Sequence, residues 1–125
     1  MNKLFLNLLI LCCNAVLMQG CARIFIEDDI IKKWRSDPWG CNNVRDNPMM
    51  NKILVYSTGL DKPRKLKLLS QLGKPDTMFL YRGWETSFYY FGSDCKNGKP
   101  IENSQDGRLE VLQDSVNIIF SFTHF

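Results

Sequence analysis

The stretch Leu66-Lys67-Leu68-Leu69-Ser70-Gln71-Leu72-Gly73-Lys74-Pro75-Asp76 separates a helical part of the chain from a β-rich part. Leu66, Leu69 and Leu72 recur at three-residue spacing, which predicts the apolar stripe of a helix. Gly73 can adopt the left-handed conformation that ends a helix, and Pro75 cannot continue one. The stretch therefore predicts the end of a helix followed by a rigid step into a sheet, in which we interpret Lys74 and Asp76 as turn-forming residues.

Three helices are expected before this turn, over residues 27–35, 49–56 and 64–72. The first has acidic residues at its start, basic residues at its end and an apolar face that includes Trp34, which we assign to the core. Asp46 and Asp61 precede the other two, each with a proline soon after, as is typical of capped helix starts.

Two β-hairpins are expected after the turn. Alternating apolar and aromatic residues predict strands over 77–82 and 85–91, with Trp84 near the tip, and over 109–113 and 116–122. Residues 92–107 form a polar loop between the hairpins. The predicted fold is α+β, with two or three N-terminal helices packed on a four-stranded antiparallel sheet in a two-layer sandwich.

The N-terminus has the features of an export signal. A positively charged start precedes a short apolar run, which ends at Gly20-Cys21. A small residue directly before a cysteine resembles the lipobox of bacterial lipoproteins, in which the cysteine carries the lipid. We therefore expect a signal peptide over residues 1–20, a lipid-anchored tether over 21–25 with Cys21 lipidated, and a single domain over 26–125. The alternative is ordinary secretion with cleavage near Ala22.

Two cysteines, Cys41 and Cys95, remain once the signal and Cys21 are set aside. An exported chain enters an oxidising compartment, where two remaining cysteines usually form a disulfide. This bond would close a loop of 54 residues and stabilise the fold by about 3–4 kcal/mol. A pair of buried free thiols is the alternative.

Composition offers little support for nucleic-acid binding or catalysis. Without residues 1–20 the chain has 15 basic and 13 acidic residues, a net charge of +2, and no dense basic tract. The single histidine, His124, is next to the end of the chain, and no glycine-rich phosphate loop or metal-ligand spacing is present. We therefore predict a protein that is not an enzyme and needs no cofactor or metal.

Several motifs together resemble a group of small lipoproteins of Bacteroidota. They are the exported cysteine, the helix bearing Trp34, the run Asp37-Pro38-Trp39-Gly40-Cys41 with Arg45 four residues on, and the Leu-Gly-Lys-Pro-Asp turn at 72–76. That turn and the following strands are similar to the SmpA/OmlA (BamE-like) domain, an accessory lipoprotein of outer-membrane assembly. The first resemblance covers most of residues 26–122, and no catalytic residues come with either group.

The resemblance implies an accessory or scaffold subunit that binds a membrane-protein partner in the cell envelope. We expect it to be anchored through Cys21, on the periplasmic side of the outer membrane, with secretion or a cell-surface position as the alternative. Tyr81, Trp84 and Tyr89 are the candidate contact residues, because aromatic side chains dominate interface energetics. A glycan- or small-ligand-binding module that uses the same rings is the second hypothesis.

Overall fold

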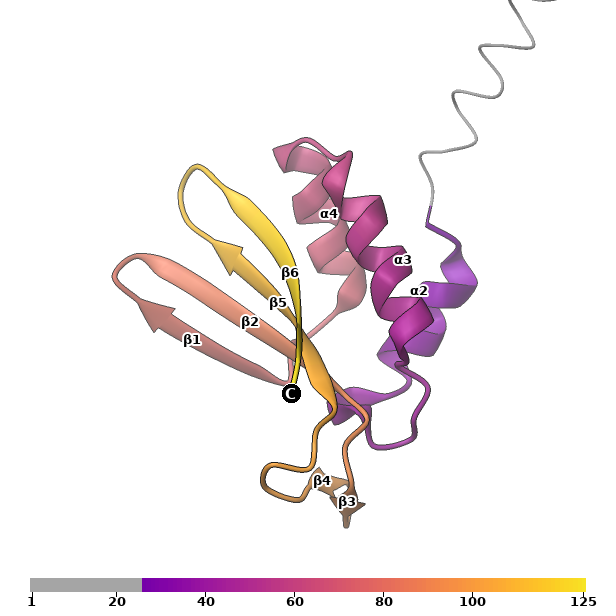
Figure 1. The fold of residues 1–125 in the computed structure, drawn as a ribbon. Helices are drawn as coiled ribbons and strands as arrows, with labels where there is room; N and C mark the ends of the chain where they lie inside the picture. Colours follow the sequence, from indigo (N-terminus) through magenta and orange to yellow (C-terminus); the bar gives the residue numbers. More distant parts are fainter. Residues whose placement is uncertain (1–25) are drawn as a thin grey trace, which may run out of the picture.

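The computed structural model describes residues 26–125, so the predicted signal peptide, the lipidation predicted at Cys21 and the predicted tether lie outside the described residues. Three α-helices come first in the described chain and strands follow (Figure 1). The helical part consists of α2 (Asp28–Arg35), the short 3-10 helix η1 (Pro38–Gly40), α3 (Asn47–Thr58) and α4 (Lys62–Leu72). The strands are β1 (Thr77–Tyr81), β2 (Trp84–Phe91), β3 (Cys95–Lys96), β4 (Lys99–Pro100), β5 (Gly107–Gln113) and β6 (Ile118–His124).

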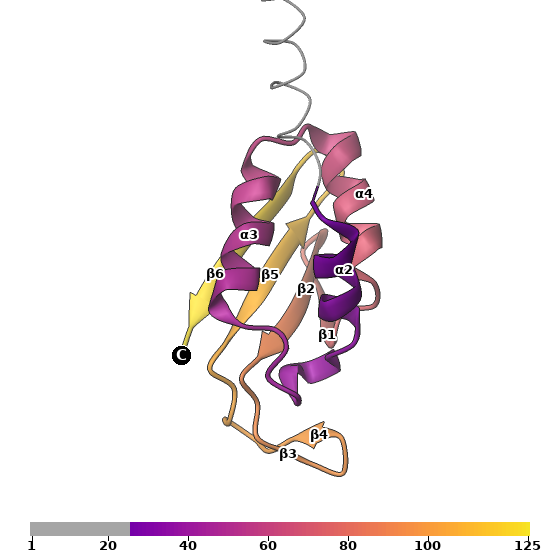
Figure 2. The same ribbon diagram turned by 90° about the vertical axis from the view of Figure 1, so that its right-hand side faces the viewer.

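Four strands form one antiparallel sheet in the order β1-β2-β5-β6, and β3 and β4 form a separate two-stranded ribbon. The three α-helices lie over one face of the larger sheet (Figure 2). This arrangement confirms the predicted α+β fold, with helices in one layer and a four-stranded antiparallel sheet in the other. No helix within residues 26–125 is long and apolar enough to cross a membrane.

The predicted helix starts are confirmed by their caps. The Asp46 carboxylate accepts a hydrogen bond from the Met49 amide at 3.0 Å, and Asp61 accepts one from Arg64 at 3.1 Å. Each interaction satisfies a backbone donor that has no partner within the first turn of the helix. Gly73, with a φ of 79°, ends α4 in a conformation that favours glycine.

The predicted stripe of α4 was wrong in one position. Leu68 and Leu72, four residues apart, are buried, whereas Leu66 is 40% exposed. Each three-residue step falls about 60° short of a full helical turn, so two steps carry Leu66 about 120° away from Leu72.

The core lies between the helices and the inward face of the sheet. Alternate strand residues point toward the helices, because side chains along a strand alternate between its two faces. From the helices the buried core includes Trp34, Met50, Ile53, Leu68 and Leu72; from the sheet it includes Tyr89, Phe91, Leu109, Val111, Ile118 and Phe120.

Three details of the strands differ from the prediction. The tip of the first hairpin is Arg82-Gly83, both with positive φ, whereas Trp84 is the first residue of β2 and pairs with Tyr81. The polar loop 92–107 contains the β3–β4 ribbon. In the last hairpin Val116 belongs to the turn, because the Asp114 carboxylate accepts hydrogen bonds from the amides of Val116 and Asn117.

Candidate functional site

A buried ion pair joins the loop after α2 to the sheet. The Arg45 guanidinium donates from Nη1 to Asp76 Oδ2 at 2.8 Å, and both side chains are 2% exposed. The guanidinium also donates to the carbonyls of Tyr90 and Trp34, at 3.2 and 3.0 Å, and its carbon atom Cζ lies 4.5 Å from the centre of the Trp34 ring. Asp76 also accepts from the Tyr90 amide at 2.8 Å. The pair thus connects α2, the start of β1 and β2.

A second carboxylate shapes the loop between α2 and α3. Asp37 is fully buried and accepts hydrogen bonds from three backbone amides, those of Asn42, Val44 and Arg45, at 2.7–3.0 Å. Gly40 has a φ of 69°, and a Cβ at this position would collide with the backbone of Phe91. Glycine is therefore required where the loop crosses β2.

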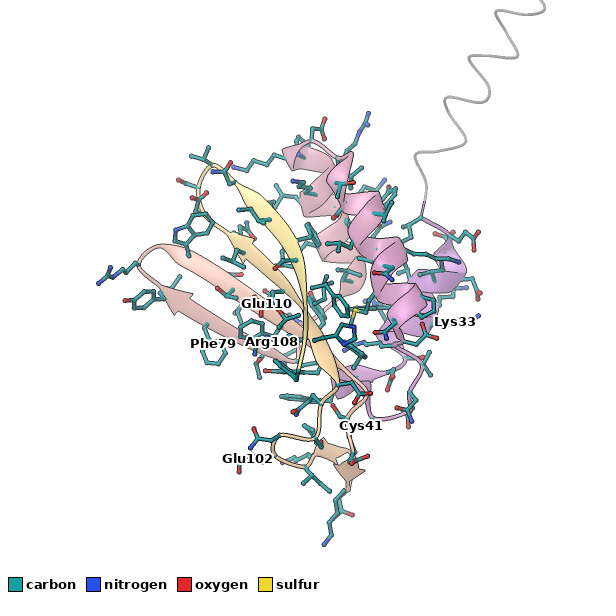
Figure 3. All side chains as sticks on the ribbon, in the orientation of Figure 1. Lys33, Cys41, Phe79, Glu102, Arg108 and Glu110 are labelled. Carbon is teal, nitrogen blue, oxygen red and sulfur yellow. A yellow bond between two sulfur atoms is a disulfide. The ribbon has the colours of Figure 1, made fainter. Side chains whose placement is uncertain are left out.

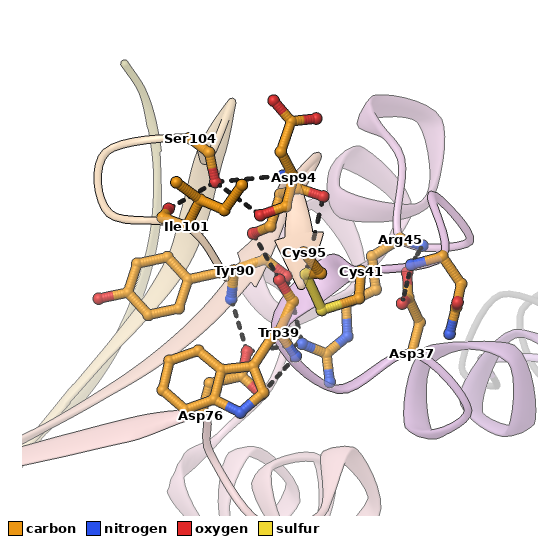
Figure 4. The surroundings of a disulfide bond; sticks show 12 residues. Asp37, Trp39, Cys41, Arg45, Asp76, Tyr90, Asp94, Cys95, Ile101 and Ser104 are labelled. Atoms are coloured by element: carbon orange, nitrogen blue, oxygen red, sulfur yellow. Dashed lines mark hydrogen bonds and ion pairs between the residues drawn. A yellow bond between two sulfur atoms is a disulfide. The ribbon is translucent and has the colours of Figure 1, made fainter. Parts of the chain in front are cut away.

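The disulfide closes the same junction from the other side. Cys41 and Cys95 are bonded (Figure 4); their Cα atoms are 5.5 Å apart and their sequence separation is 54. Next to it Ser93 donates from its amide to Gly40 and from its hydroxyl to Trp39, at 3.2 and 2.6 Å. The loop is therefore fixed to the end of β2 by covalent and hydrogen bonds together.

Burial shifts the pKa values of two groups in this region. Desolvation lowers the pKa of Arg45, and the carboxylates of Asp76 and Asp37 oppose that change. Desolvation likewise raises the pKa of Tyr89 to about 12, against the opposing charge of Arg45. The Tyr89 hydroxyl donates to the Gly73 carbonyl at 2.8 Å.

The titration of Tyr89 provides a test of this environment. Since its folded-state pKa of about 12 exceeds the ordinary value of 10, the contribution to stability is complete below pH 10 and is lost as the pH rises through 12. A shift of that size corresponds to about 2–3 kcal/mol. Ultraviolet difference absorbance should show a tyrosine ionisation near pH 12 that is absent from Tyr89→Phe. An identical titration of both proteins would contradict this assignment.

The sheet has a second face, directed away from the helices, which we call the outer face. Its aromatic residues are Phe79 and Tyr81 on β1, Trp84, Phe88 and Tyr90 on β2, and Trp39 of η1, which stacks on Tyr90. The Trp39 and Tyr90 rings are 5.8 Å apart and nearly parallel, and Phe79 and Phe88 meet edge to face at 5.5 Å. The rings form a row from Trp39 through Tyr90 and Phe88 to Phe79.

A charged pair lies beside this aromatic row. Arg108 places its guanidinium 3.9 Å from the centre of the Phe88 ring and donates to Glu110 at 2.7 Å. Figure 3 shows Arg108, Glu110 and Phe79 on the side of the sheet opposite the helices. At one end of the outer face is a pocket of about 510 Å³, lined by Tyr90, Arg108, Phe125, Glu102, Asn103 and Gln105.

The three predicted contact residues do not all lie on the same face of the sheet. Tyr81 is 67% exposed and Trp84 is half-buried, and both lie on the outer face. Tyr89 is fully buried against Trp34, so its assignment as a contact residue was wrong. Sequence reasoning missed Phe79 and Trp39 as members of this surface, and it missed the pairing of Asp76 with Arg45.

The described residues present a surface suited to binding. Within residues 26–125 no group of three or more histidine, cysteine or acidic residues is placed to hold a metal ion. His124 packs edge to face against the rings of Phe91 and Phe122. The outer face, with its partly exposed rings and a neighbouring charged pair, can contact a partner through stacking, apolar burial and hydrogen bonds.

Comparison of the chain with protein-family models, with curated proteins and with solved structures finds no match. The likeness to the BamE-like domain therefore remains a prediction from the motifs of the sequence.

Proposed function

We propose that this protein is a lipid-anchored accessory or scaffold subunit of the cell envelope that binds a membrane-protein partner without catalysing a reaction. The observation that carries the proposal is the outer face, where a row of aromatic side chains lies on the side of the sheet that the helices leave open. Exposed aromatic patches of this kind mark interaction sites, because aromatic residues are enriched where partners bind. The export signal and the lipidation of Cys21 that the sequence predicts support the envelope location.

The rigid support beneath the outer face favours this function. Trp39 is held by its amide, which donates to Asp76 at 2.9 Å, and by its carbonyl, which accepts from Ser93. Ordering these side chains before binding lowers the conformational entropy that association would otherwise cost. In this proposal the ion pair and the disulfide thus fix the position of one end of the binding surface.

Site-specific photo-crosslinking in intact cells tests partner binding. A photoreactive amino acid at Tyr81, expressed in the native host, should capture one discrete membrane protein, and Trp84→Ala should weaken that capture several-fold. Val55, on α3 and 70% exposed, is the matched control position and should not capture the same protein. Equal capture from both positions, or no adduct from Tyr81, would overturn the proposal.

Anchoring is tested separately at Cys21. If the cysteine carries the lipid, Cys21→Ser should release the protein from membranes and abolish labelling by a radioactive fatty acid. The Cys41→Ser/Cys95→Ser variant retains Cys21 and should stay labelled. Membrane retention and labelling of Cys21→Ser would show that the anchor lies elsewhere.

The pocket at the end of the outer face favours a glycan- or small-ligand-binding module as the second candidate. It combines two aromatic rings with an arginine, a carboxylate and two amides, the groups that stack on sugars and bond their hydroxyls. In that case envelope oligosaccharides should change the tryptophan fluorescence, and Arg108→Ala should abolish the change. A silent response across a broad panel would exclude this candidate.

A further inference from the structure

Strand β1 is an edge of the sheet with open pairing capacity. The order β1-β2-β5-β6 gives β1 one neighbour, β2, among the described residues. Alternate N–H and C=O groups of an edge strand point away from its neighbour and can pair with another strand. In Figure 1, β1 lies at the outer side of the larger sheet.

The side chains of β1 do nothing to block such pairing. Met78, Phe79, Leu80 and Tyr81 are 58%, 57%, 78% and 67% exposed, and they cover both faces of the strand. Thr77–Tyr81 contains no charged residue and no proline, the two features by which natural edge strands commonly prevent association.

The opposite edge of the sheet is partly covered. Helices α3 and α4 contact β6, and Lys65 of α4 donates from its ammonium to the Ile118 carbonyl at 3.0 Å. Lys62 reaches the Ser115 carbonyl beside the last turn at 2.6 Å. Among the described residues, β1 is therefore the more open edge, because its apolar side chains are exposed and no lysine is hydrogen-bonded to its backbone.

We propose that β1 pairs with β1 of a second copy of this chain, antiparallel and about a two-fold axis at Phe79. In an antiparallel pair, two opposite residues either both point their backbone N–H and C=O groups toward the partner strand or both point them away from it. These two orientations alternate along each strand. When the two strands are identical, the rule is met only if the two-fold axis passes through a residue, which then lies opposite its own copy. The axis at Phe79 is the one that pairs all five residues and joins two four-stranded sheets into one of eight.

The pairs that this register creates indicate a second copy as the occupant. Phe79 meets Phe79 of the second copy, Met78 meets its Leu80, and Thr77 meets its Tyr81, so every pair is uncharged and compatible with stacking or apolar contact. The two Arg82 side chains follow opposite ends of the paired strands, about 20 Å apart along the strand direction, so like charges do not meet. The aromatic outer faces of both copies become continuous.

The expected association is reversible. A five-residue strand is about 17 Å long, and the contact it makes is smaller than the about 1,200 Å² of a standard stable interface. The dimer should accordingly form as protein concentration rises. This inference concerns the oligomeric state and does not depend on the proposed partner or on lipid attachment.

Disulfide trapping at the axis tests both the dimer and its register. Cα atoms of directly opposite strand residues are about 4.5–5.5 Å apart, within the range of a disulfide. In the full-length chain, purified in mild detergent and mildly oxidised, Phe79→Cys should give at least five-fold more covalent dimer than Met78→Cys, Leu80→Cys or wild type. Ile119→Cys, exposed on β6, is the matched control and should stay at the wild-type level.

Sedimentation equilibrium on the same full-length chain provides a second measurement. Wild type and Ile119→Lys should show concentration-dependent dimers, and Phe79→Lys should be monomeric while keeping the wild-type circular dichroism spectrum and the Cys41–Cys95 bond. A monomeric wild type at high concentration would overturn the proposal, as would equal trapping at positions 79 and 119. A trapping maximum at 78 or 80 would overturn the register.

Discussion

Replacing Asp76 with alanine should lower the free energy of unfolding by about 3–5 kcal/mol, the cost of removing one partner from a buried ion pair. The substitution leaves the Arg45 guanidinium 2% exposed without its charged partner, and it deprives the amides of Trp39 and Tyr90 of their acceptor. Urea denaturation followed by circular dichroism measures the change. Near-ultraviolet circular dichroism should change as well, because Trp39 loses the bond that holds it against Tyr90.

Two further variants make this result specific. Asp29 forms an ion pair with Lys33 in which the side chains are 71% and 58% exposed, so Asp29→Ala should cost only a few tenths of a kcal/mol. Replacing both charged partners by apolar residues, as in Arg45→Met/Asp76→Leu, should recover part of the stability that Asp76→Ala loses. Equal effects of Asp76→Ala and Asp29→Ala would refute the structural role of the pair.

Removing the disulfide is the second change with a large expected effect. The Cys41→Ser/Cys95→Ser variant should lose about 3–4 kcal/mol, because an uncrosslinked unfolded chain regains the entropy of a 54-residue loop. Chemical denaturation with and without reductant measures the difference. Wild type should be destabilised by reductant and the double variant should be insensitive to it, so an equal response of the two proteins would contradict the prediction.

The loss should act mainly through the unfolded chain. In the folded state the same loop remains attached through the hydrogen bond from the Arg45 amide to Asp37 and the one from the Ser93 amide to Gly40, neither of which involves a sulfur atom. The double variant should therefore keep the native near-ultraviolet spectrum at low denaturant concentration. The ion pair thus stabilises this junction through contacts of the folded state, whereas the disulfide stabilises it by restricting the unfolded chain.

The fold was predictable because its signals are local. The caps at Asp46 and Asp61, the stop at Gly73 and the alternation of the strands each involve residues within one element or one turn. The predicted hairpin tip was one residue too late. Both residues of the two-residue turn, Arg82 and Gly83, have positive φ, and only the glycine indicates this from its residue type.

The outer face and the residues that support it were harder to predict from the sequence. Alternation separates Tyr89 from Tyr90, but it does not tell which face the helices cover, and so Tyr89 was placed on the wrong side. Asp76 and Arg45 are 31 residues apart among many other charged residues, and nothing local distinguishes them. The two motifs that contain them, the Leu-Gly-Lys-Pro-Asp turn and the Gly-Cys-x3-Arg spacing, meet at this ion pair.

The order of the strands has a consequence for the time course of folding. Because the four strands of the larger sheet follow one another along the chain, each hairpin can close over a short connection before distant segments meet. The contacts of the 37–45 loop with Tyr90 and Ser93 span 45–54 residues, and loop closure over such distances carries a larger entropic barrier. Cys41 should therefore reach Cys95 only after the hairpins have formed, so that oxidation of the pair marks a late step in the folding of the chain.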